Sequence, residues 1–422
     1  MIIVGHKIRL YPNRKQKILL AKSCGTARFA YNWALHNWQE QYEAGGKPNE
    51  GDLRKHLNSI KREEYPWMLD VSKCCPQRAI QNLGDAFNGF FAGVSEEPTY
   101  KKKGIDDKFY LDNISFHLKG KRIHLAKIGN VRIAENLRFE GKLLSATISR
   151  QADQWYVAIN VEVEELPQPS ETNKSIGIDL GVREYVDSDK VHKELPRAYR
   201  KAERKLRRLQ QNLSRKKKGS NNRKKAKVKV AHCHLKVANI RNDWLHKYTT
   251  NIIKNNDIIG IEDLSVKGMS KNHHLAKSIL DAGFGECKRQ LIYKSVFYGR
   301  TLIQANRFYP SSKTCSSCNE KTNQKLGLHV RSWTCEHCGA AHDRDENAAI
   351  NLKNGALKCA EQNAGSSTAS ACGEFLPLVL HGSLCNTKAP RKTRKRKKQE
   401  VSLEGNSTSE VNPAQDLLNT KP

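Results

Sequence analysis

The sequence of 422 residues has no long hydrophobic run, although 38% of its residues are hydrophobic. No stretch approaches the roughly 18 to 20 apolar residues that a membrane-spanning helix needs, so no membrane partner is expected. The first residues, Met1-Ile-Ile-Val-Gly-His-Lys7, also lack a charged segment followed by a long apolar run. A secretory signal peptide is therefore not expected, and the sequence predicts a cytoplasmic protein.

Acidic residues are scarce relative to basic ones. The sequence has 43 Asp and Glu against 74 Lys and Arg, which gives a formal net charge of +31 at pH 7. Eight basic residues lie between Lys388 and Lys398, and the rest of the chain still carries +23 without them. Residues 200–229 alone hold 15 Lys and Arg and a single acid, Glu203. Because cations that neutralise phosphates release condensed counterions, this balance predicts a nucleic-acid partner; the alternative is a merely soluble basic surface.

The 12 cysteines lack the distribution of a disulfide framework. Four of them form two pairs, Cys315-x-x-Cys318 and Cys335-x-x-Cys338, with 16 residues between the pairs. In a cytosolic chain this spacing predicts a zinc ribbon, in which four thiolates close a tetrahedral, structural Zn²⁺ site. The residue after such a pair often adopts a left-handed conformation, which suits Gly339. The other eight cysteines have no ligand spacing and are expected to be ordinary thiols.

The first half of the chain changes from strand-like to helix-like patterns and back. Residues 2–10 alternate as a strand does, and Asn13 can cap a helix predicted for residues 14–42. Helical spacing continues, with interruptions, to about Phe91. Residues 108–165 contain short alternating runs separated by polar turns, which are typical of a small β-barrel or sandwich.

The second half is predicted to mix apolar strands with helices. Strands are expected at residues 175–182, 257–264 and 302–309, and helices at 284–298 and from about Asp345 onward. A basic helical hairpin is expected between residues 196 and 255, with its turn at Gly219-Ser-Asn-Asn222. After about residue 360 the chain is rich in Ser, Gly, Ala and charge, so this part is expected to be mostly disordered.

Three acids stand at the ends of these expected elements. Asp179 and Glu262 each end an apolar strand, and Asp345 opens the last helix. A carboxylate at the C-terminal edge of a strand points into the crevice where α/β folds bind ligands. Hard cations such as Mg²⁺ prefer oxygen ligands. Two such ions can stabilise both the attacking and the leaving oxygen when a phosphodiester is hydrolysed. Any one of these acids alone would more often be a surface or capping residue, but together in so basic a chain they favour a metal site.

The order and spacing of several motifs resemble the TnpB (OrfB) family of insertion sequences, compact relatives of the type V CRISPR nucleases. The resemblance runs from residue 1 to about 355. It rests on the following residues and segments: Tyr11-Pro12, Gln16, Leu20, Gly25, Arg28, Tyr31-Asn32, Leu35, Gly177-Ile-Asp-Leu-Gly-Val182, Asp243-Trp-Leu-His-Lys247, Ile261-Glu-Asp-Leu264, Pro310-Ser-Ser-Lys-Thr-Cys-Ser316 and His342-Asp-Arg-Asp-Glu-Asn-Ala-Ala349. Departures are small, such as Asn319 where the family commonly has Gly.

The resemblance implies a multidomain α+β fold. Its nuclease is RuvC-like (RNase H-type) α/β with a zinc ribbon insertion, and its N-terminal β-barrel, or wedge, is interrupted by a helical recognition domain. The implied boundaries are 1–10 and 100–168 for the wedge, 11–99 for the helical recognition domain, 172–312 and 340–356 for the nuclease, 313–339 for the zinc ribbon, and 357–422 for a basic tail expected to be disordered.

By resemblance, Asp179, Glu262 and Asp345 are the catalytic acids and hold Mg²⁺, with two ions expected. Asp343 is the rival for the third position, but the family places the acid two residues before Asn-Ala-Ala. The structural Zn²⁺ ligands are Cys315, Cys318, Cys335 and Cys338. Nucleic-acid contacts are predicted for Arg28, Tyr31, Asn32, Arg207, Arg208, Arg215, Lys216 and Lys217. Tyr31, Trp33 and Trp38 could stack on bases or could instead pack the core of the first helices.

The resemblance implies an RNA-guided DNA endonuclease, encoded by an insertion sequence, that cuts DNA beside a short flanking motif and supports transposon maintenance. The expected partners are a transposon-derived guide RNA and double- and single-stranded target DNA, with nucleoid association when bound.

An RNase H-fold transposase is the first alternative, disfavoured because the acids here run Asp, Glu, Asp. A non-cutting RNA-guided repressor is disfavoured because all three acids are present. A sugar-kinase-like enzyme is disfavoured by the charge and by the lack of an evident second phosphate motif.

Overall fold

The computed structural model describes residues 2–165, 170–324, 326–327, 329–364 and 370–385. The chain divides into a unit Met1–Cys385 and a unit Asn386–Pro422, and the second lies outside the described residues together with the basic run 388–398. Within the described part, no helix combines the length and the apolar character needed to cross a membrane. Two seven-stranded sheets organise the first unit.

The first sheet is antiparallel and has the strand order β2-β6-β7-β1-β5-β4-β3. Its strands are β1 (Ile2–Tyr11), β2 (Lys108–Asp112), β3 (Phe116–Lys119), β4 (Arg122–Leu125), β5 (Gly129–Ile133), β6 (Lys142–Gln151) and β7 (Gln154–Val163). The first strand alternates as predicted, with Val4, Ile8 and Leu10 buried and the residues between them mostly exposed. One face of the sheet therefore contributes to an apolar core.

Three helices lie between β1 and β2 in the sequence: α1 (Arg14–Glu43), α2 (Glu50–Ile60) and α3 (Cys74–Phe91). As predicted, Asn13 caps α1, in a capping box completed by Gln16. Trp38 of α1 stacks on Phe87 of α3, with ring centroids 4.3 Å apart. Trp38 and Tyr31 are both buried, so the core-packing alternative is confirmed for these two aromatics.

The second sheet is mixed and has the order β10-β9-β8-β11-β12-β15-β16. Its strands are β8 (Ser175–Leu180), β9 (Glu184–Asp187), β10 (His192–Glu194), β11 (Ile258–Ile261), β12 (Thr301–Ala305), β15 (Phe375–Leu380) and β16 (Ser383–Leu384). The three central strands β8, β11 and β12 are parallel, and the flanking pairs are antiparallel. Parallel neighbours bring the C-terminal ends of their strands to one edge of the sheet, where the predicted acids stand.

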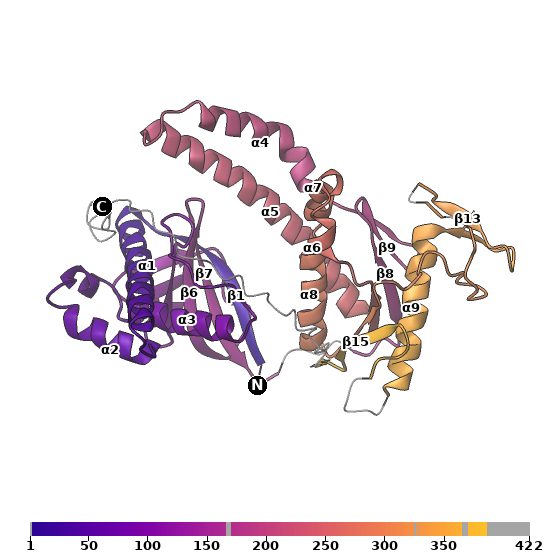
Figure 1. Cartoon of the computed structure of the whole chain (residues 1–422), viewed down its shortest axis with the longest axis horizontal. Helices are drawn as coiled ribbons and strands as arrows, with labels where there is room; N and C mark the ends of the chain where they lie inside the picture. The colour runs from indigo at the N-terminus through magenta and orange to yellow at the C-terminus, as the bar shows by residue number, and fades with distance from the viewer. Residues whose placement is uncertain (1, 166–169, 325, 328, 365–369, 386–422) are drawn as a thin grey trace, which may run out of the picture. The chain divides into compact units, whose positions relative to one another are not determined.

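Helices join and cover these strands. They are α4 (Ala198–Ser214), α5 (Asn221–Asn255), α6 (Val266–Met269), α7 (His273–Ala282), α8 (Phe284–Phe297) and α9 (Arg344–Gln362). The helices α4 and α5 form the predicted hairpin, with Ser220 capping α5, and run side by side in Figure 1. The helix α9 lies along β8 (Figure 1).

The predicted disorder from residue 357 onward is wrong for two segments. The helix α9 continues to Gln362, and residues 375–380 form β15, which pairs antiparallel with β12. Phe375 and Val379 are buried, and the Phe375 ring lies so close to Gly355 that an added Cβ there would be 2.0 Å from it. The short apolar run of β15 is stabilised by this distant helix, which a local composition argument does not take into account.

Candidate functional site

Asp179 and Glu262 follow two residues that are paired directly across parallel strands. Ile178 of β8 is in register with Ile261 of β11. The next residue on each strand is the acid. The two carboxylates therefore leave the sheet side by side at its C-terminal edge, as the sequence predicted.

Two glycines allow α9 to pack against this part of the sheet. Gly177 and Gly260 are paired across β8 and β11, one residue before the isoleucines. A Cβ added at Gly177 would lie 2.0 Å from the carbonyl oxygen of Ala349, and one at Gly260 would lie 2.4 Å from that of Leu352. Only glycine permits so close an approach of the helix backbone. The approach brings the start of α9 to the strand ends.

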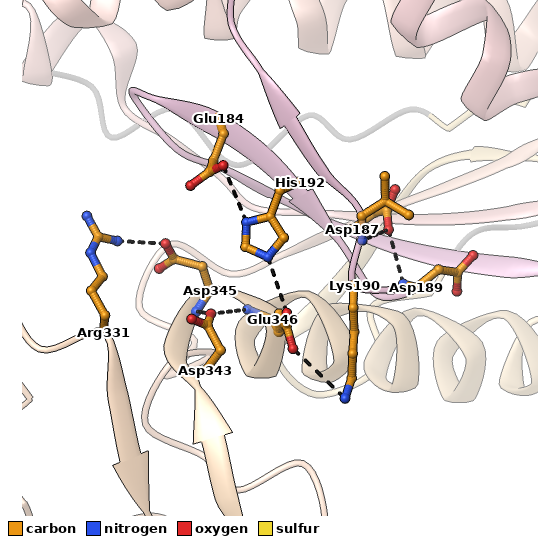
Figure 2. A network of polar contacts seen from close by, with 10 residues as sticks. Glu184, Asp187, Asp189, Lys190, His192, Arg331, Asp343, Asp345 and Glu346 are labelled. Carbon is orange, nitrogen blue, oxygen red and sulfur yellow. Dashed lines mark hydrogen bonds and ion pairs between the residues drawn. The ribbon is translucent and has the colours of Figure 1, made fainter.

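The start of α9 distinguishes Asp343 from its rival Asp345. The carboxylate of Asp343 is the helix N-cap and accepts hydrogen bonds from the backbone N–H groups of Asp345 and Glu346, at 2.9 and 3.1 Å. Figure 2 shows Asp343 turned onto the helix end and Asp345 turned away from it, toward Arg331. Asp343 is therefore engaged in capping, and Asp345 is the acid available to the strand-end pair.

The electrostatics link all three acids. Burial raises the pKa of Asp179 well above its ordinary value, and the negative charges of Glu262 and Asp345 raise it further. Burial and the charge of Asp345 also raise the pKa of Glu262, while a hydrogen bond from Ser311 opposes the change. The Arg344 guanidinium lowers both values but does not outweigh these effects. Crowded carboxylates with raised pKa values are typical of functional sites.

Asp345 is paired with Arg331, which precedes β13 (Ser332–Thr334). The Nη1 atom of Arg331 donates to Oδ2 of Asp345 at 2.6 Å. Among the described residues, the only group of three or more Cys, His, Asp or Glu whose ligand atoms all lie within 4.8 Å of one another is the cysteine quartet. The three acids therefore interact electrostatically, but their carboxylate oxygens do not form a group of this kind. Arg331 binds only one of the two carboxylate oxygens of Asp345.

A network of hydrogen bonds connects Glu262 to α9 and to the cysteine segment. The Ser311 hydroxyl donates to Oε1 of Glu262 at 2.9 Å. The side-chain amide of Asn351 donates to the Ser311 and Thr314 carbonyl oxygens at 2.8 and 2.6 Å. Asn347 donates to the same Thr314 oxygen at 2.7 Å and accepts from the Ser316 N–H at 2.9 Å. These bonds fix the segment 311–316 against α9, and so fix the hydroxyl that orients Glu262.

A second polar network flanks the start of α9. His192 of β10 lies between two carboxylates: its Nδ1 is 3.4 Å from Oε2 of Glu184, and its Nε2 is 3.2 Å from Oε1 of Glu346 (Figure 2). These two acids raise the pKa of His192 although partial burial lowers it. Lys190 lies 3.9 Å from the other oxygen of Glu346. The network ties the β9–β10 hairpin to the helix that carries Asp345.

The four predicted zinc ligands converge. Their Sγ atoms lie within 4.8 Å of one another, with Cys315 and Cys338 3.6 Å apart and Cys318 and Cys335 3.7 Å apart. A tetrahedron with Zn–S bonds of about 2.3 Å has S–S edges of about 3.8 Å, so the four thiols fit Zn²⁺.

The backbone of both cysteine pairs also has the predicted shape. The N–H of the residue after each pair donates back to the first cysteine, from Asn319 to Cys315 at 2.8 Å and from Gly339 to Cys335 at 2.9 Å. Asn319 and Gly339 both have positive φ, as expected for Gly339. The strands β13 and β14 (Ala341–Asp343) pair next to this cluster and lead directly into α9. The Nε2 atom of His342 on β14 lies 3.0 Å from Sγ of Cys315.

Three of the predicted nucleic-acid contacts have partners within the chain. Arg28 pairs with Asp107 at 3.0 Å, and Tyr31 is buried with the Lys101 ammonium over its ring. The side-chain amide of Asn32 both donates to and accepts from the Lys101 backbone. These residues attach α1 to the segment before β2, so their predicted role in nucleic-acid binding finds no support here.

The other five predicted contacts lie on the basic hairpin. Arg207, Arg208, Arg215, Lys216 and Lys217 are exposed on α4 and on the turn to α5. Of the 15 Lys and Arg of residues 200–229, only Arg223 is partly shielded. The hairpin therefore presents a dense field of solvated cations that suits a phosphate backbone.

The sequence assigned no role to the residues that assemble the site, although three of them stand within the family motifs: Gly177, Ser311 and Asn347 in the motifs, and Gly260, Asn351 and Arg331 outside them. One available signal was the repeat of Ile-Gly-Ile before an acid, at 176–178 and again at 259–261. Two glycines at equivalent places of two apolar strands indicate a close backbone approach. The pairing of Arg331 with Asp345 has no comparable local signal in the sequence.

Three family models match the chain. One described as "Probable transposase" (OrfB of IS605) matches residues 158–273, a Cas12f1-like TNB domain matches 284–352, and an OrfB helix-turn-helix domain matches 1–47. In this structure the last range forms β1 and α1.

Relatives named "Putative RNA-guided DNA endonuclease" match nearly the whole chain. The one from Streptomyces pristinaespiralis is 36% identical over 380 residues, which cover 87% of this chain and 90% of the relative. The one from Escherichia coli K12, InsQ, is 32% identical over 390 residues, covering 88% and 94%. A solved Cas12f1 in complex with sgRNA and target DNA shares the fold, with a TM-score of 0.53 at 13% identity over 84% of this chain and 99% of that one.

These matches define a class of mixed α/β proteins with a Cas12f1-like fold and a TNB domain. The chain belongs to the TnpB (OrfB) family, which confirms the resemblance seen in its sequence motifs.

Proposed function

We propose that this protein is an RNA-guided DNA endonuclease that hydrolyses phosphodiester bonds. Its catalytic acids would be Asp179, Glu262 and Asp345. The observation that carries the proposal is the crowding of these acids at the C-terminal edge of parallel strands, where burial and neighbouring carboxylates raise the pKa of Asp179 and of Glu262. The names of the relatives agree with this function. The strand order of the second sheet is compatible with an RNase H-type nuclease domain built from residues 172–312 and 340–356.

The three acids suit divalent cations because a cation would relieve their repulsion. Asp179 and Glu262 would supply oxygens from the sheet, and Asp345, of which one oxygen pairs with Arg331, would supply a third. Bound Mg²⁺, in two sites, would polarise the scissile phosphate and activate the attacking water. The chain's own contribution is orientation: Ser311 holds Glu262, and Asp343 fixes the helix end that carries Asp345.

Base pairing with a guide RNA would supply sequence specificity, and the protein would hold the nucleic-acid backbones. The exposed cations of the α4–α5 hairpin, including Arg207, Arg208 and Arg215, suit the RNA or the heteroduplex. The first sheet and α1–α3 would form the wedge and recognition domains that read a short flanking motif. The guide would come from the transposon that encodes the protein.

The quartet of Cys315, Cys318, Cys335 and Cys338 would bind a structural Zn²⁺. Two of the sulfur separations match a closed tetrahedral site and all four atoms lie within 4.8 Å, and four thiolate ligands would leave no open position for water. The metal would hold the ribbon from which Arg331 reaches Asp345. Replacing Cys335 with Ser should remove zinc and increase hydrogen exchange in residues 313–343, whereas Cys233→Ser should do neither. Purified protein without zinc, by elemental analysis, would contradict the assignment.

The central experiment compares the wild type with Asp179→Ala after co-expression with the transposon end. Both should co-purify with a discrete RNA that ends in sequence flanking the element, and both should bind matching DNA. Only the wild type should cut it, with a loss of more than about a thousandfold in the variant, and only when a divalent cation is present. Full cleavage by Asp179→Ala would refute the site. Strand joining would instead indicate a transposase, and RNA-guided binding without cutting by the wild type would indicate a repressor.

A further inference from the structure

Phe308 is a large apolar side chain that the fold leaves in solvent. Its exposed fraction is 86%, whereas the adjacent Tyr309 is half-buried and packs edge-to-face on Phe375, with ring centroids 4.8 Å apart. The strand β12 ends at Ala305, before the predicted end at residue 309, so both aromatics lie in the loop that leads to the cysteine segment. One aromatic holds this loop to the fold, and the other is presented outward.

The loop around Phe308 is held by several bonds. The Asn306 N–H donates to the Glu374 carbonyl, and its own carbonyl accepts from the Tyr309 N–H at 3.0 Å. The side-chain oxygen of Asn306 accepts from the Phe308 N–H at 3.3 Å. Bonds at Asn306, Phe308 and Tyr309 fix the backbone from which the ring projects, so little backbone entropy remains to be lost when a ligand binds.

The same loop is attached to the acidic site on both sides of Phe308. Arg307 donates to Oδ2 of Asp263, the residue after Glu262, at 2.7 Å. Ser311 donates to Glu262 itself at 2.9 Å. The Cα atom of Phe308 is therefore within about 11 Å of that of Ser311, the limit for three residues of chain.

We propose that Phe308 stacks on an unpaired nucleobase of the DNA strand whose phosphodiester bond enters the acidic site. The proposal rests on the proposed nuclease function, because a strand at the carboxylates must place its bases near this loop. An exposed ring on a fixed backbone offers the π-face on which any base can stack without regard to sequence. The charge of the segment favours the same ligand, since the exposed Lys313 lies five residues along it and suits a phosphate.

Stacking would position the strand and would select against duplex DNA. A base within an intact duplex has both faces covered by its neighbours, so it cannot offer one to Phe308 without unstacking. The ring would therefore favour the displaced single strands that RNA pairing produces. A protein partner on this face, such as a second copy of the chain, is the competing occupant that the experiment must separate.

The first measurement uses complexes of the Asp179→Ala variant, which should bind without cutting. Target DNA carries 2-aminopurine at successive positions around the cleavage site, and stacking on an aromatic ring quenches its fluorescence. The 2-aminopurine at one position should be quenched in this complex. Its fluorescence should recover in the double variant that combines Asp179→Ala with Phe308→Ala. Ile114→Ala is the matched control, because Ile114 is 89% exposed and belongs to the first sheet region. Equal fluorescence with and without the Phe308 ring at every position would overturn the proposal.

The second measurement uses cleavage by the otherwise wild-type protein. Phe308→Ala should slow cutting of single-stranded DNA on the order of tenfold, and Phe308→Trp should retain the rate. An abasic nucleotide at the quenched position should slow the wild type by a similar factor and should not slow Phe308→Ala further. Additive losses, or a loss in Phe308→Ala that accompanies a change in oligomeric state, would mean that the ring contacts something other than that base. If the wild type does not cut at all, the nuclease function fails first; if it cuts and Phe308→Ala cuts equally well, only the stacking fails.

Discussion

Asp107 and Asp179 are two acids of one chain whose surroundings act in opposite directions. The Asp107 side chain is 6% exposed and lies between Arg28, at 3.0 Å, and Arg150, with the Gly104 N–H at 3.2 Å. Burial raises the pKa of Asp107, but the Gly104 N–H and the two arginines outweigh it, and the pKa falls below its ordinary value. Around Asp179, burial and two further carboxylates act together and raise the pKa well above that value.

The difference separates an acid whose charge is compensated within the fold from an acid whose charge is not. The counter-ions of Asp107 are Arg28 of α1 and Arg150 of β6, so this acid joins the two elements. Its negative charge is already neutralised and does not attract a ligand. The cluster of Asp179, Glu262 and Asp345 has three acids near the single guanidinium of Arg344, with Arg331 paired to Asp345 alone. A buried site with excess negative charge is unfavourable unless a cation joins it, which is the physical reason for the metal site that we propose there.

The same substitution at both positions should give opposite changes in stability. Asp107→Asn leaves two guanidinium groups beside a neutral amide and should lower the free energy of unfolding by about 3 kcal/mol. Asp179→Asn removes a repelling charge and should raise the stability of the magnesium-free protein by about 1 kcal/mol. Denaturant unfolding with zinc retained and magnesium omitted measures both. A comparable loss in both variants would mean that Asp179 already has a counter-ion within the fold.

The second prediction tests the packing that produces the crowding. Gly177→Ala places a Cβ where the Ala349 carbonyl now lies, so α9 must move away from β8. The expected loss is about 1–3 kcal/mol of stability, with a large loss of cleavage because Asp345 moves with the helix. The control is Gly285→Ala in α8, where an added Cβ meets nothing within 4 Å and should stabilise by about 0.4–1 kcal/mol. A Gly177→Ala protein that cuts normally would show that the close approach of α9 is unnecessary.

Local patterns predicted most of the elements and the places of the three acids at strand ends and at a helix start, because caps and hydrophobic periodicity are properties of neighbouring residues. The capping box at Asn13, the hairpin turn near Gly219 and the cysteine pairs all belong to this kind. The features that were missed depend on distant partners. The strand β15 is stabilised by Gly355, and the pairing of Arg331 with Asp345 requires the ribbon to fold back on α9. No window of sequence contains both members of such a pair in their final geometry.

The third prediction compares how the two acids respond to pH. The folded pKa of Asp107 is lowered, so its stabilising contribution is present above the unfolded pKa, about 3.9, and is lost as the pH falls below it. The folded pKa of Asp179 is raised, so the site is most stable when protonated and loses stability as the pH rises from about 4 to the folded pKa. Unfolding of magnesium-free wild type and Asp179→Asn should therefore diverge with rising pH in favour of the variant. Parallel curves, or a divergence that Mg²⁺ does not remove, would be inconsistent with this interpretation.

The smallest expected effect concerns Ser311, which donates a hydrogen bond to one of the crowded acids. Ser311→Ala keeps the carbonyl that Asn351 binds and removes only the hydroxyl that donates to Glu262. Because that bond lowers the pKa of Glu262, its loss should raise this pKa and cost about 1 kcal/mol, or roughly a fivefold loss of cleavage rate near neutral pH. The rate of the variant should approach that of the wild type as the pH rises, because Glu262 then ionises without help. Ser312→Ala, one residue along, should leave the pH–rate profile unchanged. A loss in Ser311→Ala that is the same at every pH would mean that Ser311 only supports the fold, and that Glu262 is oriented by other contacts.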